Sequence, residues 1–242
     1  MPQIAPEFYV GYSPKAPPSL ATFLGRVVVA VGLASLTLAV VVAFAQASFI
    51  PRRFEFQQYR SYRGTLFERP YPVLESSGLT YLLVARGKHG AGELVSGLDG
   101  RSVRLDGALI QSGPDHALEI LPGSVKPGDA MSAPRPNVRL GPLTITGEIV
   151  DTKCYLGVMN PGRGKVHKDC AIRCISGGIP PGLLVRDSAG KSGIIYLSGR
   201  DSQSIGRRIL RLVGEPIILH GELFKVGSQL VLQVAPEEFP RE

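Results

Sequence analysis

The hydrophobic pattern of the chain begins with one long apolar run. Residues 27–50 contain no charged side chain. At about 1.5 Å per residue, a helix of this length crosses a hydrocarbon core of about 30 Å. The pattern therefore predicts an N-terminal tail over residues 1–26 and a transmembrane helix over residues 27–50. A cleaved signal peptide is the alternative interpretation, because Ala45-Gln46-Ala47 resembles a signal-peptidase site.

After residue 50, short apolar runs alternate with glycine- and proline-containing turns, which is typical of an all-β fold. The most informative feature of this region is an internal repeat, in which residues 101–120 align without gaps to residues 215–234. The matched pairs include Leu105 with Leu219, Gly107 with Gly221, Gly113 with Gly227, and Leu118 with Leu232. Each copy predicts a strand, a glycine turn and a second strand.

The two copies differ in one connection. Gly64 lies in the first predicted strand of one copy, and Gly147 lies in the first predicted strand of the other, 83 residues later. In the aligned repeat, by contrast, corresponding residues are 114 positions apart. The difference, 114 − 83 = 31, places an insertion at about residues 153–183, and all three cysteines lie in it. Because loops on a rigid frame tend to carry function, we expect the functional residues in this insertion.

The predicted order of strand, strand, short helix, strand, strand is that of a small OB-like β-barrel. We therefore expect a mainly β protein, in which a single transmembrane helix precedes two OB-like modules at residues 51–122 and 143–238. A linker rich in proline and glycine, residues 123–142, joins them. The second module carries the insertion, which we expect to be helical. A single larger β-sandwich with a coincidental repeat is the alternative.

The insertion is predicted to contain a strand over residues 148–155 and a helix over residues 165–175. Gly177 and Gly178 follow the helix and are typical of a helix end. Positions i, i+3 and i+7 of a helix share one face. The residue types at those positions therefore decide what the helix presents to the preceding strand.

These positions are occupied by His167, Cys170 and Cys174, and Cys154 lies at the predicted end of the strand. We expect the four side chains to meet and to bind a metal, because three thiolates and one imidazole suit zinc or an iron–sulfur centre, with copper also possible. Asp151 is predicted to orient the imidazole of His167 from outside the ligand set.

Two alternatives involve the same cysteines without a metal. In an exported domain, Cys154 could form a disulfide with Cys170 or Cys174. The three thiols could also be reduced and simply buried. The sequence contains no G-x-S-x-G, G-x₄-G-K-[ST], H-E-x-x-H or C-x-x-C-H motif, so it predicts no catalytic residue and disfavours an enzyme.

Residues 147–181 resemble a loose group of uncharacterised bacterial envelope proteins. These share a strand that begins G-E-[IV]-[IV]-D, then a cysteine, then H-x-x-C-A-x-x-C-I and a bend that contains glycine and proline. The matching residues here are Gly147 to Asp151, Cys154, His167, Cys170-Ala171, Cys174-Ile175 and Gly178 to Pro180. The resemblance implies an exported domain and no particular activity.

The net charge of +7 comes without tryptophan and without a stripe of basic and aromatic residues, which argues against nucleic acid as a partner. Arginines near the apolar run instead favour contact with anionic lipid. Two basic residues precede the run and four follow it closely, which favours a cytoplasmic domain, whereas the Ala-Gln-Ala site favours export.

We expect a single-pass membrane protein with a periplasmic or otherwise extracytoplasmic domain. It would be a metal-binding accessory protein that serves a membrane complex, such as a redox complex. The alternative function is a structural or assembly subunit whose cysteines form a stabilising disulfide.

Overall fold

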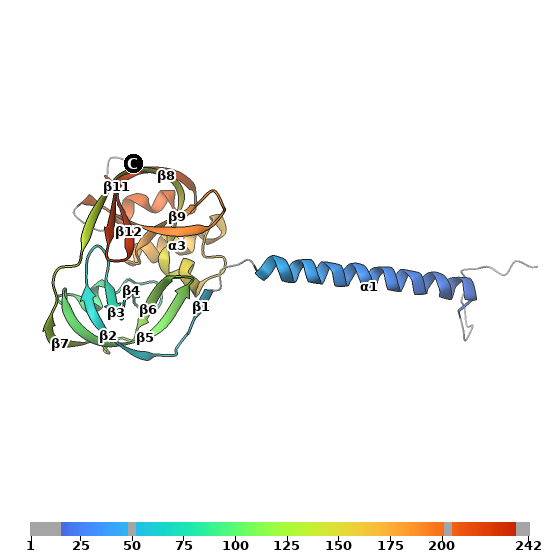
Figure 1. Ribbon diagram of the computed structural model, residues 1–242, viewed down its shortest axis with the longest axis horizontal. Coiled ribbons are helices and arrows are strands. Elements are labelled where there is room, and N and C mark those ends of the chain that lie inside the picture. The colour runs from blue at the N-terminus through green and yellow to red at the C-terminus, as the bar shows by residue number, and fades with distance from the viewer. Residues whose placement is uncertain (1–15, 48–51, 201–204, 236–242) are drawn as a thin grey trace, which may run out of the picture. The chain divides into compact units, whose positions relative to one another are not determined.

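The computed structural model of the chain describes residues 16–47, 52–200 and 205–235. The chain divides into two compact units, Met1–Ile50 and Pro51–Glu242 (Figure 1). The first 15 residues of the expected tail, residues 48–50 of the expected membrane span and the ends of the two expected modules at residues 51 and 236–238 lie outside the described residues.

The first unit contains one helix, α1 (Pro18–Ala47), among its described residues. The stretch Pro18–Ala45 is long and apolar enough to cross a membrane, a test that a signal sequence near the N-terminus also passes. The helix begins nine residues before the predicted span and includes Arg26. A proline suits the first turn of a helix, where its missing N–H has no intrahelical partner, and this explains the earlier start.

The second unit is mainly β. Its first half, residues 52–131, contains β1 (Arg52–Phe54), β2 (Arg60–Phe67), β3 (Val73–Ser76), β4 (Leu79–Val84), α2 (Gly92–Val95), β5 (Arg101–Ser112), β6 (Asp115–Ile120) and β7 (Lys126–Met131). Its second half, residues 137–235, contains β8 (Asn137–Asp151), the π-helical turn η1 (Cys154–Val158), the 3-10 helix η2 (Lys165–His167), α3 (Lys168–Ser176), β9 (Pro181–Arg186), β10 (Ser192–Ser198), the 3-10 helix η4 (Gly206–Leu212), β11 (Pro216–Val226) and β12 (Gln229–Gln233).

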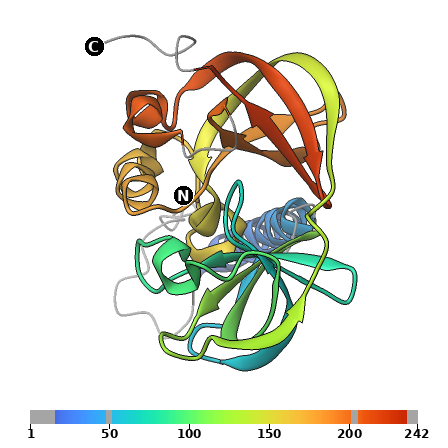
Figure 2. The same cartoon turned by 90° about the vertical axis from the view of Figure 1, so that its left-hand side faces the viewer.

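The strands of the second half form a closed barrel in the order β10-β12-β11-β8-β9. In the first half, β2, β3, β4, β6 and β5 pair in the same sequential pattern, and β5 also pairs with β2. The third and fifth strands of each set run parallel: β4 with β6, and β10 with β12. Figure 2 shows the two sets one above the other within this unit.

The sequence repeat is a structural repeat. Residues 101–120 form β5 and β6, and residues 215–234 contain β11 and β12. The hairpin turns between these strands contain Gly113 at φ +55° and Gly227 at φ +58°. Glycine adopts this left-handed conformation without the steric cost that a Cβ atom brings. The predicted strands and glycine turns are therefore confirmed in both copies.

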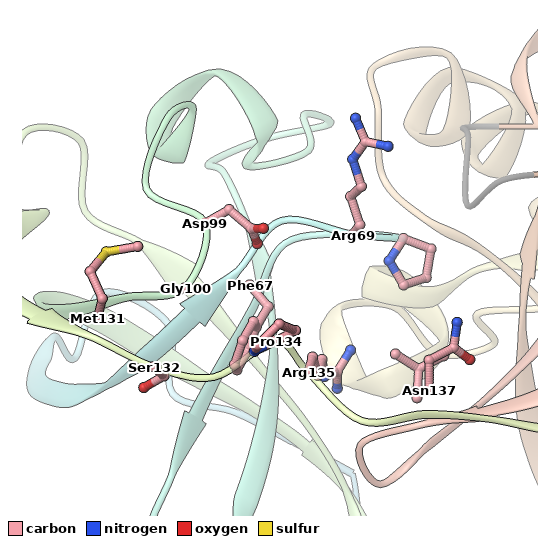
Figure 3. A pocket seen from close by; sticks show the side chains of 11 residues that line it. Phe67, Arg69, Asp99, Gly100, Met131, Ser132, Pro134, Arg135 and Asn137 are labelled. Atoms are coloured by element: carbon pink, nitrogen blue, oxygen red, sulfur yellow. The ribbon is translucent and has the colours of Figure 1, made fainter.

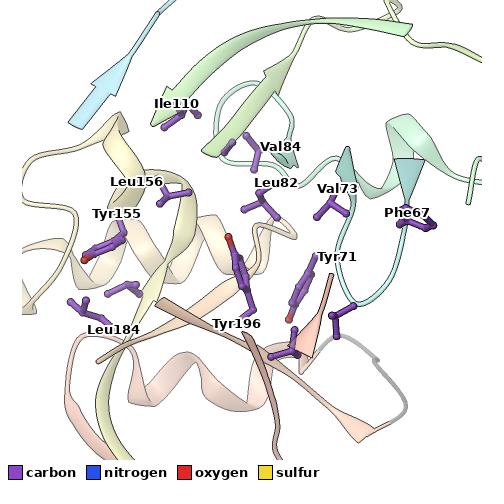
Figure 4. Packing of buried hydrophobic residues seen from close by; sticks show 14 residues of the cluster. Phe67, Tyr71, Val73, Leu82, Val84, Ile110, Tyr155, Leu156, Leu184 and Tyr196 are labelled. Atoms are coloured by element: carbon purple, nitrogen blue, oxygen red, sulfur yellow. The ribbon is translucent and has the colours of Figure 1, made fainter. Parts of the chain in front are cut away.

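The two halves share a hydrophobic core. Each half has its own buried cluster, and a third cluster is built from side chains of both halves (Figure 4). This shared cluster comprises Phe67, Tyr71, Val73, Leu82, Val84, Ile110 and Ala117 from the first half, and Val150, Tyr155, Leu156, Leu184, Tyr196, Val226 and Val231 from the second. The hydroxyl of Tyr71 also donates a hydrogen bond to the carbonyl oxygen of Leu197.

Three predicted segments differ in the structure. The segment expected to be a linker, residues 123–142, carries β7, which pairs with β5, and the first residues of β8, which pair with β11. The strand expected over residues 148–155 ends at Asp151. The short helix expected between the third and fourth strands of the second module is present, but it is the 3-10 helix η4.

Candidate metal centre

The insertion begins where β8 stops. The carboxylate oxygen Oδ1 of Asp151 accepts a hydrogen bond from the backbone N–H of Cys154 at 2.8 Å. A carboxylate that accepts from the amide three residues later caps a helical turn, which is why the chain turns into η1 here and does not continue as a strand. At the same point the hydroxyl of Thr152 donates to the carbonyl oxygen of Pro180 at 2.8 Å and closes the base of the insertion.

Helix α3 is positioned by its apolar face. Ala171 and Ile175 are buried and belong to the hydrophobic cluster of the second half. The helix contacts β8 and η4 (Figure 2). Its last turn is closed by the backbone N–H of Gly177, which donates to the carbonyl oxygens of Arg173 and Cys174. The helix therefore sits on the barrel with its orientation fixed.

The three cysteines meet. The sulfur atoms of Cys154, Cys170 and Cys174 all lie within 4.8 Å of one another. Cys154 and Cys174 are buried, Cys170 is half-buried, and all three, each within the described residues, are free thiols. The structure therefore confirms that α3 brings its two sulfurs to the sulfur of Cys154, which is the first residue of η1. It does not contain the disulfide of the alternative interpretation.

His167 belongs to a second, overlapping group. Ligand atoms of Asp151, Cys154 and His167 also lie within 4.8 Å of one another, and all three residues are buried. The ring atom Nε2 of His167 is 2.9 Å from Oδ2 of Asp151, a contact that restrains the imidazole. Cys154 is the member that the two groups share. His167 precedes the first residue of α3 and ends η2, so it is not within the α-helix proper.

The surroundings shift the pKa values of two of the thiols in opposite directions. The hydrogen bond with Cys174, burial and the negative charge of Asp151 together raise the pKa of the Cys154 thiol. The same hydrogen bond lowers the pKa of Cys174, which is the acceptor. Cys154 therefore keeps its proton at neutral pH and donates it towards the Cys174 sulfur, which is the more readily ionised of the two.

Lys88 is a residue of the site that the sequence analysis missed. Its Nζ atom donates to Sγ of Cys170 at 2.7 Å and lies 3.9 Å from Sγ of Cys174. The hydrogen bond with Cys170 raises the pKa of Lys88. Lys88 lies between β4 and α2, in the first half, and no spacing or periodicity in the sequence relates this segment to the cysteines.

Lys153 was also missed, although it is adjacent to Cys154. Its side chain is only 2% exposed and extends into the first half. There its Nζ atom donates to Oε2 of Glu119 at 2.6 Å and to the carbonyl oxygens of Ala85 at 2.7 Å and Gly87 at 2.8 Å. A lysine whose three N–H groups all bind buried oxygen atoms holds the insertion against the first half.

A separate cavity of about 360 Å³ lies between β2, β7 and the start of β8 (Figure 3). Arg135 lines it and donates to Oε1 of Glu75 at 2.7 Å and to Oε1 of Gln229 at 3.3 Å. Among the described residues, the lining of this cavity includes none of the three cysteines. The cavity is therefore distinct from the cysteine group.

Comparison with known proteins gives no match: no protein-family profile, no curated protein sequence and no solved structure matches the chain. Function must therefore be argued from the arrangement of the residues themselves.

Proposed function

We propose that this chain is a membrane-anchored accessory protein that binds one metal ion, zinc in the first place, through Cys154, His167, Cys170 and Cys174. The single observation that carries the proposal is the gathering of three free thiols within 4.8 Å of one another. Two buried cysteines and one half-buried cysteine rarely converge for packing alone, because each could be replaced by an apolar side chain of similar size.

The spacing of the sulfurs favours a single ion over a cluster. With zinc–sulfur bonds of about 2.3 Å, tetrahedral geometry places two ligating sulfurs about 3.8 Å apart. Three sulfurs that all lie within 4.8 Å of one another are compatible with this arrangement. In an iron–sulfur cluster the protein ligands are distributed over two or more iron atoms, which separates some of them further. Copper remains compatible with the same soft donors.

The proposed fourth ligand is His167, a member of the second group. Asp151 binds Nε2 of His167, which leaves Nδ1 as the nitrogen free to bind a metal. An imidazole that is held by a carboxylate on one nitrogen and binds metal with the other is a frequent arrangement in zinc sites. Cys154 lies in both groups and so links His167 to the three sulfurs, although the four donors do not form one group within 4.8 Å; His167 would have to move closer to the other two sulfurs to bind the same ion.

The scaffold and the location complete the proposal. Five strands in the same pairing order in each half, with the third and fifth parallel and a short helix between the third and the fourth, support two OB-like modules at residues 51–122 and 143–238. We infer that α1 is retained as an anchor and that the domain is extracytoplasmic, in contact with lipid and a membrane protein complex. In an oxidising compartment, three free neighbouring thiols persist best when a metal binds them.

The test is the metal content of the full chain, purified in detergent without oxygen. We expect about one zinc per chain by mass spectrometry of the metal, and three thiols that react only after a chelator is added. Cys154→Ser should reduce the metal content to less than about one tenth, since it removes the member shared by both groups. His167→Gln should weaken binding, whereas His220→Gln, an exposed histidine on β11, should not.

Two results would contradict the proposal. One is a metal-free wild-type chain with one reactive thiol and one disulfide, which would favour the structural role. The other is a Cys154→Ser variant that retains the full metal content, which would move the binding site elsewhere.

A further inference from the structure

The structure points to a role for Lys88 that no cysteine or histidine supplies. We propose that Lys88, a residue of the first half, is a positioning residue of the metal centre, which covers its solvent-facing side and slows exchange of the bound ion. This inference rests on the proposed function and concerns how the ion enters and leaves.

The centre has one side open to solvent. Cys154 and Cys174 are 4% and 1% exposed, and His167 is 3% exposed, whereas Cys170 is half-buried. A chelator or a metal donor in solution therefore reaches the cysteine group through Cys170. The ammonium group of Lys88, an exposed residue, lies 2.7 Å from that sulfur and occupies this side of the group.

The backbone around Lys88 is held in place by contacts that do not involve its own side chain. Lys153 binds the carbonyl oxygens of Ala85 and Gly87. On the other side, the backbone N–H of Gly90 donates to the carbonyl oxygen of Gly177 at 2.9 Å, at the end of α3. The backbone approach there is so close that a Cβ on Gly177 would collide with the carbonyl oxygen of Lys88.

Charge gives Lys88 its effect on a bound ion. A divalent ion with three thiolates and a neutral imidazole carries a net charge of −1, and the ammonium of Lys88 compensates it. A hydrogen bond to a metal-bound thiolate also restrains that ligand, and loss of such outer contacts commonly weakens a metal site by 10–100-fold. Because Lys88 is exposed, its electrostatic contribution is screened by salt.

The experiment measures the release of zinc from the loaded full chain in detergent to an excess of a colorimetric chelator. We expect Lys88→Met to release zinc about 10-fold faster than the wild type at the same zinc content, and Lys88→Arg to restore most of the difference. Arg86→Met is the matched control, since Arg86 is exposed on the same loop, and its release rate should remain within about twofold of the wild type.

Salt separates an electrostatic role from a structural one. Raising the salt concentration from about 0.05 M to about 0.5 M should accelerate release from the wild type and leave Lys88→Met nearly unchanged. The inference is overturned if Lys88→Met and Lys88→Gln release zinc as slowly as the wild type, while the wild type still binds one zinc. A wild type that binds no zinc would instead overturn the proposed function, and this inference with it.

Discussion

The connection between the first and second strands is the place where the two halves of Pro51–Glu242 diverge. In the first half, residues 68–72 join β2 to β3 directly. In the second half, residues 152–180 join β8 to β9 and contain η1, η2, α3 and all three cysteines. The strand pairings on either side of these connections are the same. The comparison shows that a β-scaffold can acquire a candidate metal centre in one connection while its strand order stays unchanged.

The comparison also shows that the longer connection does not work alone. The first half contributes Lys88 to the cysteine group and Glu119 to Lys153. The half without cysteines therefore supports the half with them. Substitutions at these contacts, and at matched positions of the two halves, measure how far the halves depend on each other and how far they remain equivalent.

The largest effect is expected from Lys153→Met. This change leaves the buried carboxylate of Glu119 without its partner and removes a donor from two carbonyl oxygens. Breaking a buried ion pair on one side costs about 3–5 kcal/mol, and urea unfolding of the full chain in detergent should show this loss. Lys168→Met is the control, because its pair with Glu215 is part-exposed and should contribute less than about 1 kcal/mol.

A double change sharpens this result. Lys153→Met combined with Glu119→Met removes both charges, so much of the lost stability should return, since an apolar pair of similar size often replaces a buried ion pair without cost. If the single change has no effect on unfolding, the insertion is not held to the first half by Lys153.

A smaller and equal effect is expected at two matched glycines. A Cβ on Gly147 would lie 2.7 Å from the carbonyl oxygen of Leu184 on β9. A Cβ on Gly64 would collide with the carbonyl oxygen of Glu75 on β3. Gly64→Ala and Gly147→Ala should each cost about 1–3 kcal/mol in urea unfolding, because they force the paired strands apart. Gly193→Ala, where no atom lies within 4 Å, is the control.

Unequal losses in the free energy of unfolding for Gly64→Ala and Gly147→Ala would also be informative. They would mean that the two halves match in strand order but not in the spacing of their first two strands, and the structural equivalence of the repeat would fail at this point.

The smallest effect is the pH dependence of zinc binding, which only the second half should show. The raised pKa of Cys154 keeps its thiol protonated at neutral pH, so zinc must displace that proton when it binds. Affinity should therefore fall as the pH is lowered, by about tenfold (about 1.4 kcal/mol) per pH unit for each proton displaced. Zinc competition titrations between about pH 6 and pH 8 measure the slope, and a zero slope would exclude Cys154 as a ligand.

The sequence predicted the repeated parts of this molecule well because they have local signals. Alternating apolar positions and a glycine at each turn define β5, β6, β11 and β12. Helical spacing predicted that the two cysteines of α3 share one face of the helix. The burial of Ala171 and Ile175 shows which face of that helix packs on the barrel. Cys154 was expected to join them, and it does.

What the sequence did not predict depends on distant or competing contacts. The strand was expected to extend to residue 155, but a hydrogen bond from Cys154 N–H to the Asp151 side chain ends it at Asp151. Asp151 itself is the local signal for this end, because an aspartate side chain readily accepts from the backbone N–H two or three residues later and so starts a helical turn. Lys88 and Lys153 reach their partners across the two halves, at separations of 82 and 34 residues for Cys170 and Glu119, and no local pattern encodes such contacts.

The apolar layer in Figure 4 also has a consequence for the history of the chain. A duplicated domain is usually free to be lost, copied or recombined into other proteins. Here seven apolar side chains from each copy cover one another, so either copy in isolation would expose an apolar surface. It would also lose one partner of the Lys153–Glu119 ion pair. Separating the two copies would therefore require this layer to be replaced as well.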